Sequence, residues 1–182
     1  MRIIAGQLRG KPLAAPKGEV TRPTADRVRE TLFNMLASRL GSLEGLSVAD
    51  LFAGSGALGL EALSRGAGCC LFVEQEAEAL TALRKNIASL NVQHQSTVQA
   101  GSVMTLGPAR APADLLLLDP PYGTGAGVVA LHRLLRLGWL TAASWAVVET
   151  ARTEDVAVQG FETESERRVG RAKLTFLRPV AS

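Results

Sequence analysis

Four consecutive residues, Asp119-Pro120-Pro121-Tyr122, bring a carboxylate, two rigid rings and an aromatic side chain together. They follow the largely apolar run 113–118, which is typical of a buried parallel strand that two prolines cannot continue. The exocyclic amine of a nucleobase attacks poorly because its lone pair is delocalised into the ring. Acceptors for its two N–H bonds favour a pyramidal, nucleophilic nitrogen. The Asp119 carboxylate and the Pro120 carbonyl oxygen could be these acceptors.

Tyr122 adds a ring that can stack on a base, a contact worth about 1–3 kcal/mol. The stretch therefore predicts a site for a planar group that carries an amine. Asp119, Pro120 and Tyr122 are the catalytic candidates, and Pro121 and Tyr122 are candidates for substrate contact. The alternative is a strand end followed by an ordinary turn, with Tyr122 packed in the core.

A glycine-rich loop precedes this stretch, where Gly54-x-Gly56-x-x-Gly59 matches the fingerprint of dinucleotide-binding proteins. Glu74 follows Gly54 by 20 residues, at the end of the next predicted strand, where an acid can bind ribose hydroxyls. Glycine lets backbone N–H groups approach a ligand closely. Taken alone, the loop supports an NAD-type oxidoreductase as well as it supports a nucleoside-binding transferase.

Two features favour S-adenosylmethionine over a redox dinucleotide. Asp50 lies four residues before the first glycine, where its carboxylate could meet an ammonium group and would repel a pyrophosphate. Hydride transfer needs an acid or base, and neither histidine follows a predicted strand. S-adenosylmethionine would use Asp50 on its amino-acid side, Gly54 and Gly56 for close approach, and Glu74 on its ribose.

Strands and helices that alternate from residue 46 onward predict a parallel sheet which positions these groups. We expect strands at 46–52, 69–73, 96–100, 114–118 and 145–149, and helices at 57–65, 78–90 and 128–137. The segments 156–161 and 172–177 are expected to form a closing strand pair, joined by the charged segment 162–171. Upstream, we expect a small hairpin over residues 2–14 and a helix from about Thr24 to Gly41.

The net charge of +3 is unevenly distributed over the 182 residues. Residues 1–40 carry eight Lys or Arg against three acids, which suggests a surface for a polyanion. Arg22, Arg27 and Arg29 are candidates for RNA phosphates, although helix-surface arginines often do no more than face solvent.

The sequence gives no support for a metal site, a membrane span or a signal peptide. Cys69 and Cys70 are adjacent in an apolar run, which favours core packing, and the histidines lack metal-ligand spacing, so no metal is expected. No apolar run approaches the roughly 20 residues that span a bilayer, and the N-terminus does not resemble a signal peptide. We expect a cytoplasmic monomer.

The motifs together resemble a known family. D-L-F-A-G-S-G at 50–56 and D-P-P-Y at 119–122 look like class I S-adenosylmethionine-dependent methyltransferases that act on exocyclic amines. The segments 2–6 and 22–34 are similar to those of RsmD-type 16S rRNA guanine-N2 methyltransferases. The resemblance implies a doubly wound α/β fold, Rossmann-like, with a mostly parallel seven-stranded sheet and an antiparallel last strand. It also implies an N-terminal hairpin and helix extension over 1–40, which contacts RNA, and a methyltransferase core over 41–182.

In this resemblance the substrate is one guanine of 16S rRNA, free or in the small ribosomal subunit or its assembly intermediate. The cofactor contacts are assigned to Asp50, Phe52, Ala53, Gly54, Gly56, Glu74, Gln75, Ser102, Val103 and Asp119. Ser102 stands where such enzymes commonly have an acid or amide for adenine, so we expect backbone groups at Ser102 and Val103 to contribute. An NAD-dependent oxidoreductase, an adenine-N6 or protein-glutamine methyltransferase, and an RNA-binding module without catalysis remain alternatives.

Overall fold

The computed structural model describes residues 1–17 and 23–181. The strands are β1 Ser47–Asp50, β2 Cys69–Glu74, β3 Ser96–Ala100, β4 Leu115–Leu118, β5 Trp145–Ala151, β6 Phe161–Val169 and β7 Ala172–Pro179. The helices are α1 Pro23–Leu40, α2 Ala57–Ser64, α3 Ala77–Ser89 and α4 Ala126–Arg136, with 3-10 turns η1 Gln93–Gln95 and η2 Val103–Thr105.

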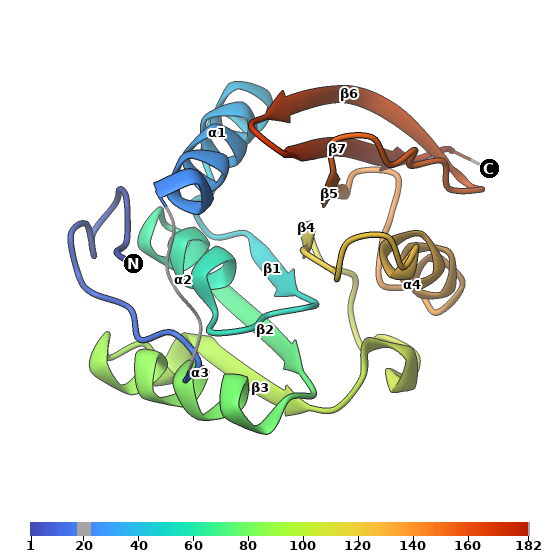
Figure 1. Cartoon of the computed structure of the whole chain (residues 1–182). Helices are drawn as coiled ribbons and strands as arrows, with labels where there is room; N and C mark the ends of the chain where they lie inside the picture. The colour runs from blue at the N-terminus through green and yellow to red at the C-terminus, as the bar shows by residue number, and fades with distance from the viewer. Residues whose placement is uncertain (18–22, 182) are drawn as a thin grey trace.

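In the described part of the chain, the strands form one seven-stranded sheet in the order β3-β2-β1-β4-β5-β7-β6 (Figure 1). Strands β1 to β5 are parallel, and β7 runs antiparallel to β5 and β6 on its two sides. The predicted α/β fold, with its antiparallel last strand, is confirmed.

The sheet separates two apolar cores, because successive residues of a strand face opposite sides. In β4, Leu115 and Leu117 belong to the core with α1, α2 and α3, whereas Leu116 and Leu118 belong to the core with α4. Figure 1 shows these helices on the two faces of the sheet. All four leucines are buried, which explains the continuous apolar run before Asp119.

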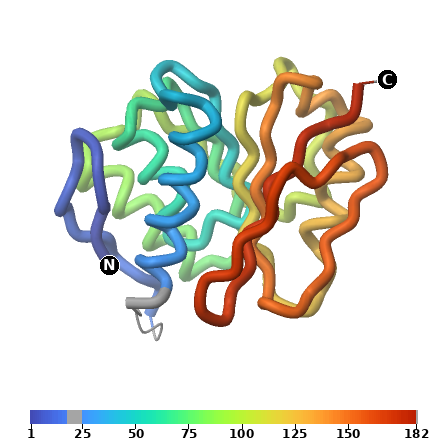
Figure 2. The backbone as a smooth tube through the Cα atoms, turned by 90° about the horizontal axis from the view of Figure 1, so that it is seen from above, coloured from blue at the N-terminus to red at the C-terminus, as the bar shows by residue number. Residues whose placement is uncertain are grey.

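The first residues of the chain form the predicted hairpin. The backbone N–H of Ile3 donates to the Lys11 carbonyl oxygen at 3.0 Å, and that of Leu13 donates to the Met1 carbonyl oxygen at 2.7 Å. Gly6 permits close packing on α2, since a Cβ there would lie 2.0 Å from the Ser64 carbonyl oxygen. The hairpin therefore lies beside α2 and α3, as both overall views show (Figures 1 and 2).

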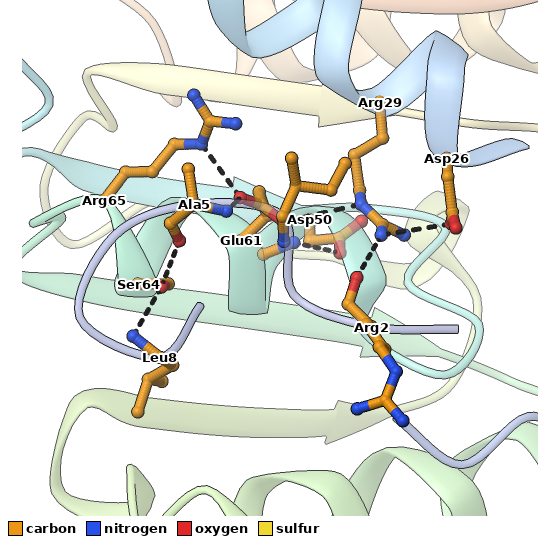
Figure 3. Close-up of polar contacts among 11 residues, drawn as sticks. Arg2, Ala5, Leu8, Asp26, Arg29, Asp50, Glu61, Ser64 and Arg65 are labelled. Carbon is orange, nitrogen blue, oxygen red and sulfur yellow. Dashed lines mark hydrogen bonds and ion pairs between the residues drawn. The ribbon is translucent and has the colours of Figure 1, made fainter. Parts of the chain in front are cut away.

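A buried carboxylate on α2 fastens this hairpin to the fold (Figure 3). The Glu61 side chain is fully buried, and its two oxygen atoms accept the backbone N–H groups of Ile4 at 2.8 Å and Ala5 at 3.0 Å. Its carboxylate also pairs with Arg65 Nε at 2.9 Å and with Arg29 Nε at 3.5 Å. Two cations and two amide donors thus compensate the cost of burying this charge.

The other end of α1 is attached to the last two strands. Arg39 Nε lies 2.7 Å from Glu164 Oε2 on β6, and the Arg39 guanidinium lies 5.0 Å from the centre of the Phe176 ring on β7. Seen from above, α1 lies between the hairpin and these strands (Figure 2). The helix therefore connects the N-terminal segment to both halves of the sheet.

The expected closing strand pair is wrong in its first member. Residues 152–160 are loop, and the strand beside β7 is β6. All of β6 except Phe161 lies in the segment 162–171, which is predicted above to be a connector. Val156 and Val158 are buried against the α4 core, which explains their apolar signal without a strand. β6 is an edge strand, and edge strands often carry charged side chains that discourage pairing with other chains.

The expectation that both cysteines pack in the core is half right. Cys70 is buried, whereas Cys69, the first residue of β2, is exposed. Burial raises the pKa of the Cys70 thiol.

Candidate active site

The carboxyl ends of β1, β2 and β4 meet at one edge of the sheet and form the wall of a pocket of about 670 Å³. This volume is typical of small-molecule sites, and the edge is where open α/β sheets bind ligands. The lining contains these residues predicted from the sequence: Asp50, Phe52, Ala53, Gly54, Glu74, Gln75, Ser102, Val103, Asp119, Pro120, Pro121 and Arg29. The fold therefore brings the glycine loop and the proline corner into one cavity.

Asp50 lines this pocket and is only 1% exposed. Its Oδ2 atom accepts the backbone N–H of Gly59 at 2.9 Å, whereas Oδ1 is buried and accepts no hydrogen bond within the described part of the chain. Burial raises the pKa of Asp50 to about 7; the Gly59 N–H opposes this rise and the charge of Glu74 adds to it. A cationic donor beside Oδ1 would supply a missing partner and favour the charged form.

Glycine occupies the three fingerprint positions for different structural reasons. Gly54 has a φ of +56° and lines the pocket, and a Cβ there would meet nothing within 4 Å. Gly56 has a φ of +90°, and its Cβ would lie 2.5 Å from Leu83 Cδ1, while a Cβ on Gly59 would lie 2.4 Å from Phe72 Cε1. Gly54 therefore shapes the pocket. Gly56, which we expected at the ligand, lies outside the lining and allows the turn to pack.

Glu74 is held at the end of β2 by backbone amides. Its Oε1 atom accepts the N–H of Gly54 at 2.7 Å, and its Oε2 atom accepts those of Gln75 and Glu76 at 2.8 Å each. A carboxylate has about four lone-pair positions, so acceptor capacity remains for a hydroxyl donor. The contact with Gly54 joins the end of β2 directly to the glycine loop.

Ser102 caps the 3-10 turn that follows β3. Its hydroxyl oxygen accepts the backbone N–H of Met104 at 3.1 Å, and its carbonyl oxygen accepts that of Thr105 at 3.0 Å. Val103, the next residue, is buried and also lines the pocket. The Ser102 hydroxyl keeps its own O–H donor and a second lone pair, so both this side chain and the nearby backbone groups could contact a bound base.

The proline corner lies where β4 leaves the sheet. Asp119 is exposed at the pocket, whereas Pro120 is buried beneath the start of α4. A Cβ on Gly127 of α4 would lie 3.3 Å from Pro120 Cγ, so the helix packs closely on the proline. This packing fixes the backbone that carries the Asp119 carboxylate.

Tyr122 is 48% exposed and lies outside the pocket lining, so the alternative that packs it in the core is wrong. Its phenol donates a hydrogen bond to Glu149 Oε2 with an oxygen–oxygen distance of 2.8 Å. Burial, followed by the neighbouring Glu149, raises the pKa of the Tyr122 phenol. The ring is held near the pocket by a carboxylate of the neighbouring strand.

Glu149 is a pocket residue that the sequence analysis missed. It interrupts the apolar run 145–148 near the carboxyl end of β5, and this interruption was the available signal. The β4–β5 register pairs Leu118 with Val148, which places Asp119 beside Glu149. Burial raises the pKa of the Glu149 carboxyl, and hydrogen bonds with Tyr122 and Asp119 oppose the rise.

The three arginines predicted to contact RNA have different positions. Arg27 is exposed on α1, and Arg22 lies outside the described residues. Arg29 is only 4% exposed and binds Glu61 and the Asp26 carboxylate, the latter at 3.2 Å from its Nη2 atom. The expectation of a surface cation is wrong for Arg29, because its charge is used inside the fold. Burial lowers the pKa of its guanidinium, and Glu61 and Asp26 oppose this change.

Residues 1–178 match the family model described as "Conserved hypothetical protein 95". The chain belongs to this family. Ribosomal RNA small subunit methyltransferase D of Escherichia coli K12 is 39% identical over 150 residues, which cover 82% of this chain and 74% of that protein. Its counterpart in Haemophilus influenzae is 37% identical over 156 residues, 84% of this chain and 79% of the other.

A solved structure of this kind shares the whole fold. "Putative methyltransferase yhhF" of Escherichia coli superimposes with a TM-score of 0.84 at 34% identity, covering 100% of this chain and 99% of that one. The resemblance to RsmD-type proteins, and with it the prediction of a class I methyltransferase, is confirmed.

Two further observations concern the described residues only. They contain no group of three or more His, Cys, Asp or Glu side chains arranged to hold a metal ion. None of their helices is both long and apolar enough to cross a membrane.

Proposed function

We propose that this protein transfers the methyl group of S-adenosyl-L-methionine to the exocyclic N2 amine of a guanine in 16S rRNA. The observation that carries the proposal is one pocket that contains both Asp50 and Glu74, suited to the donor, and the Asp119-Pro120 corner, suited to an amine. The names of the curated relatives, small subunit rRNA methyltransferases, support the same substrate.

The residues of the pocket fit the proposed donor. The buried Asp50 Oδ1 atom, which accepts no hydrogen bond within the described residues, suits the amino-acid end with its ammonium group. Glu74 is placed for the ribose hydroxyls, with Gln75 beside it, and Gly54 and Ala53 leave room for close approach. The bound donor supplies a methyl group activated by a positively charged sulfur.

The chain's own part in the reaction is to position the acceptor amine. The Asp119 carboxylate and the Pro120 carbonyl oxygen accept its two N–H bonds, and the ring of Tyr122 stacks on the base. Asp119 need not be a strong base, since the amine can lose its proton after transfer. Alignment of nitrogen, methyl and sulfur provides most of the acceleration. A guanine that is paired or stacked must first be flipped out, at a cost of a few kcal/mol.

Residues 1–40 would act as an RNA-contacting extension to a methyltransferase core over 41–182. The exposed cations of the extension in the described residues are Arg2, Arg9, Lys11, Lys17 and Arg27, and Arg22 is a further candidate. Met1 and Ala25 line the pocket, so this basic segment borders the proposed site. Phosphate contacts of this type weaken as salt concentration rises.

The substrate also suggests a setting for the enzyme. We propose a cytoplasmic monomer that acts on 16S rRNA, free or in the small ribosomal subunit or its assembly intermediate. A redox dinucleotide is disfavoured, because the buried Asp50 carboxylate would lie near its pyrophosphate.

The test is a transfer assay with donor labelled on its methyl group and unmodified small-subunit rRNA or particles, followed by nuclease mapping. We expect one labelled N2-methylguanine. Calorimetry should detect binding of S-adenosylhomocysteine, and NADH fluorescence should not change. Label on an adenine or a protein, or a pocket that accepts NADH instead, would contradict the proposal.

A further inference from the structure

We propose that Glu149 selects guanine by accepting its N1–H, while the neighbouring Asp119 accepts the adjacent N2 amine. This inference rests on the proposed function and names the residue that would separate a guanine-N2 enzyme from an adenine-N6 enzyme. Glu149 would then contact the base and determine specificity, in addition to holding Tyr122.

The geometry places two carboxylates side by side at the acceptor end of the pocket. Asp119 follows β4 directly, Glu149 lies near the end of β5, and the pairing of Leu118 with Val148 puts them at the same level. Both side chains line the pocket, and they hydrogen-bond to each other, a contact that the two donors of a bound guanine would replace. Glu149 Oε2 already accepts the Tyr122 phenol at 2.8 Å, which fixes the orientation of the carboxyl group.

The edges of the two purines differ at the atom that would face Glu149. Guanine presents N1–H next to its N2 amine, so adjacent donors point at the two acceptors. Adenine presents an N1 lone pair next to its N6 amine, which would oppose a carboxylate without a hydrogen bond between them. Asp119 and Pro120 can hold either amine, so they cannot make this distinction. A second carboxylate beside them can.

The charges around Glu149 are consistent with a role that requires a donor from the substrate. Asp119 and Tyr122 hydrogen-bond to Glu149, and neither of them is a cation. Burial raises the pKa of the Glu149 carboxyl. A guanine N1–H would therefore provide an interaction that favours the carboxylate form, as hydrogen bonds to a charged group do.

A purely structural role is the competing explanation, in which Glu149 only positions Tyr122. The two roles differ in their response to 2-aminopurine, which keeps the N2 amine but has a lone pair in place of N1–H. A structural role predicts that Glu149→Gln lowers methylation of guanine and 2-aminopurine by the same factor. A base-reading role predicts that the ratio of the two rates changes.

The experiment compares kcat/KM for synthetic RNAs that carry guanine or 2-aminopurine at the mapped target position. We expect the wild-type enzyme to prefer guanine by roughly 10–100-fold, the range of a good bidentate contact with a base edge. Glu149→Gln, whose amide can donate to the lone pair of 2-aminopurine, should remove most of that preference. Asp155→Asn is the matched control, because Asp155 is an exposed acid outside the pocket lining and should leave the ratio unchanged.

The outcomes test the role of Glu149 separately from the proposed methylation of guanine. Absence of any guanine methylation by the wild-type enzyme would count against the proposed function. Normal guanine methylation with no preference over 2-aminopurine would overturn the role of Glu149, whatever the variants do. So would a preference that Glu149→Gln retains. The ratio is a property of each active molecule, so partial unfolding of a variant does not alter it, and affinity for S-adenosylhomocysteine confirms that each pocket is intact.

Discussion

Asp119 is the residue on which the proposed transfer chemistry depends most directly. Asp119→Ala removes one of two acceptors for the amine, and loss of alignment of this kind costs about 100-fold in rate. The donor should still bind, because Asp50 and Glu74 lie on other strands. Single-turnover methylation and calorimetry with S-adenosylhomocysteine measure the two effects.

Asp155→Ala is the control for the Asp119 variant, since Asp155 is an exposed acid outside the pocket lining. It should behave as wild type in both measurements. Undiminished methylation by Asp119→Ala would remove this carboxylate from the mechanism.

Asp50 gives a second prediction at the scale of one residue, because its pKa is raised to about 7 by burial. The folded protein holds this proton more tightly than the unfolded chain, so its stabilising effect is present below pH 4 and is lost as pH rises through 7. Asp50→Asn cannot ionise. Its Tm should therefore rise relative to wild type between pH 5 and pH 8, while its affinity for S-adenosylhomocysteine falls roughly 10-fold or more.

Thermal unfolding across that pH range, without ligand, provides the comparison. A Tm difference between Asp50→Asn and wild type that stays constant with pH would show that Asp50 does not ionise in this window. An unchanged ligand affinity would argue against its contact with the ammonium group.

At the scale of elements, Glu61 determines whether the hairpin stays docked on α2. Glu61→Ala leaves the N–H groups of Ile4 and Ala5 without an acceptor. It also removes the carboxylate paired with Arg65 and leaves Arg29 with Asp26 as its remaining carboxylate partner. Breaking a buried ion pair costs roughly 3–5 kcal/mol, so Tm should fall and amide exchange should accelerate at Ile4 and Ala5 first. Hydrogen exchange read by mass spectrometry resolves the hairpin from the sheet.

Glu30→Ala serves as the control for the hairpin, because Glu30 is an exposed acid on α1. Its exchange pattern should match wild type. If Glu61→Ala instead destabilised every segment equally, the hairpin would be an inseparable part of the global folding unit.

The elements also show what the sequence could predict. The spacing of apolar residues and the positions of turn residues predicted β1 to β5, the hairpin and the glycine loop, because each of these has a strong local pattern. β6 was missed because an edge strand carries charge, a pattern also typical of loops. Arg29 and Glu149 were misjudged or missed because their roles depend on contacts far along the chain: Glu61 for the first, and the β4–β5 register for the second.

At the scale of the whole molecule, the two ends of the chain meet through α1. The helix carries Arg29 into the α2 network and Arg39 onto β6 and β7, so the basic N-terminal region is fixed relative to the pocket. A fixed cationic surface beside a pocket can guide RNA phosphates and present one base to the site. RNA affinity and methyl transfer are therefore expected to be separable properties of this fold.

Reversing charges on the hairpin tests whether RNA binding can be changed without changing the pocket. The double variant Arg9→Glu and Lys11→Glu reverses two exposed cations and should weaken rRNA binding and its salt dependence, while leaving affinity for S-adenosylhomocysteine unchanged. The double variant Arg110→Glu and Arg136→Glu is the matched control, because it changes the net charge equally at two exposed cations near the end of α4, on the other face of the sheet. Filter binding at salt concentrations from roughly 50 to 300 mM gives the slope of log affinity against log salt concentration for each protein. Equal slopes for the hairpin variant, the control and wild type would place the RNA surface elsewhere on the molecule.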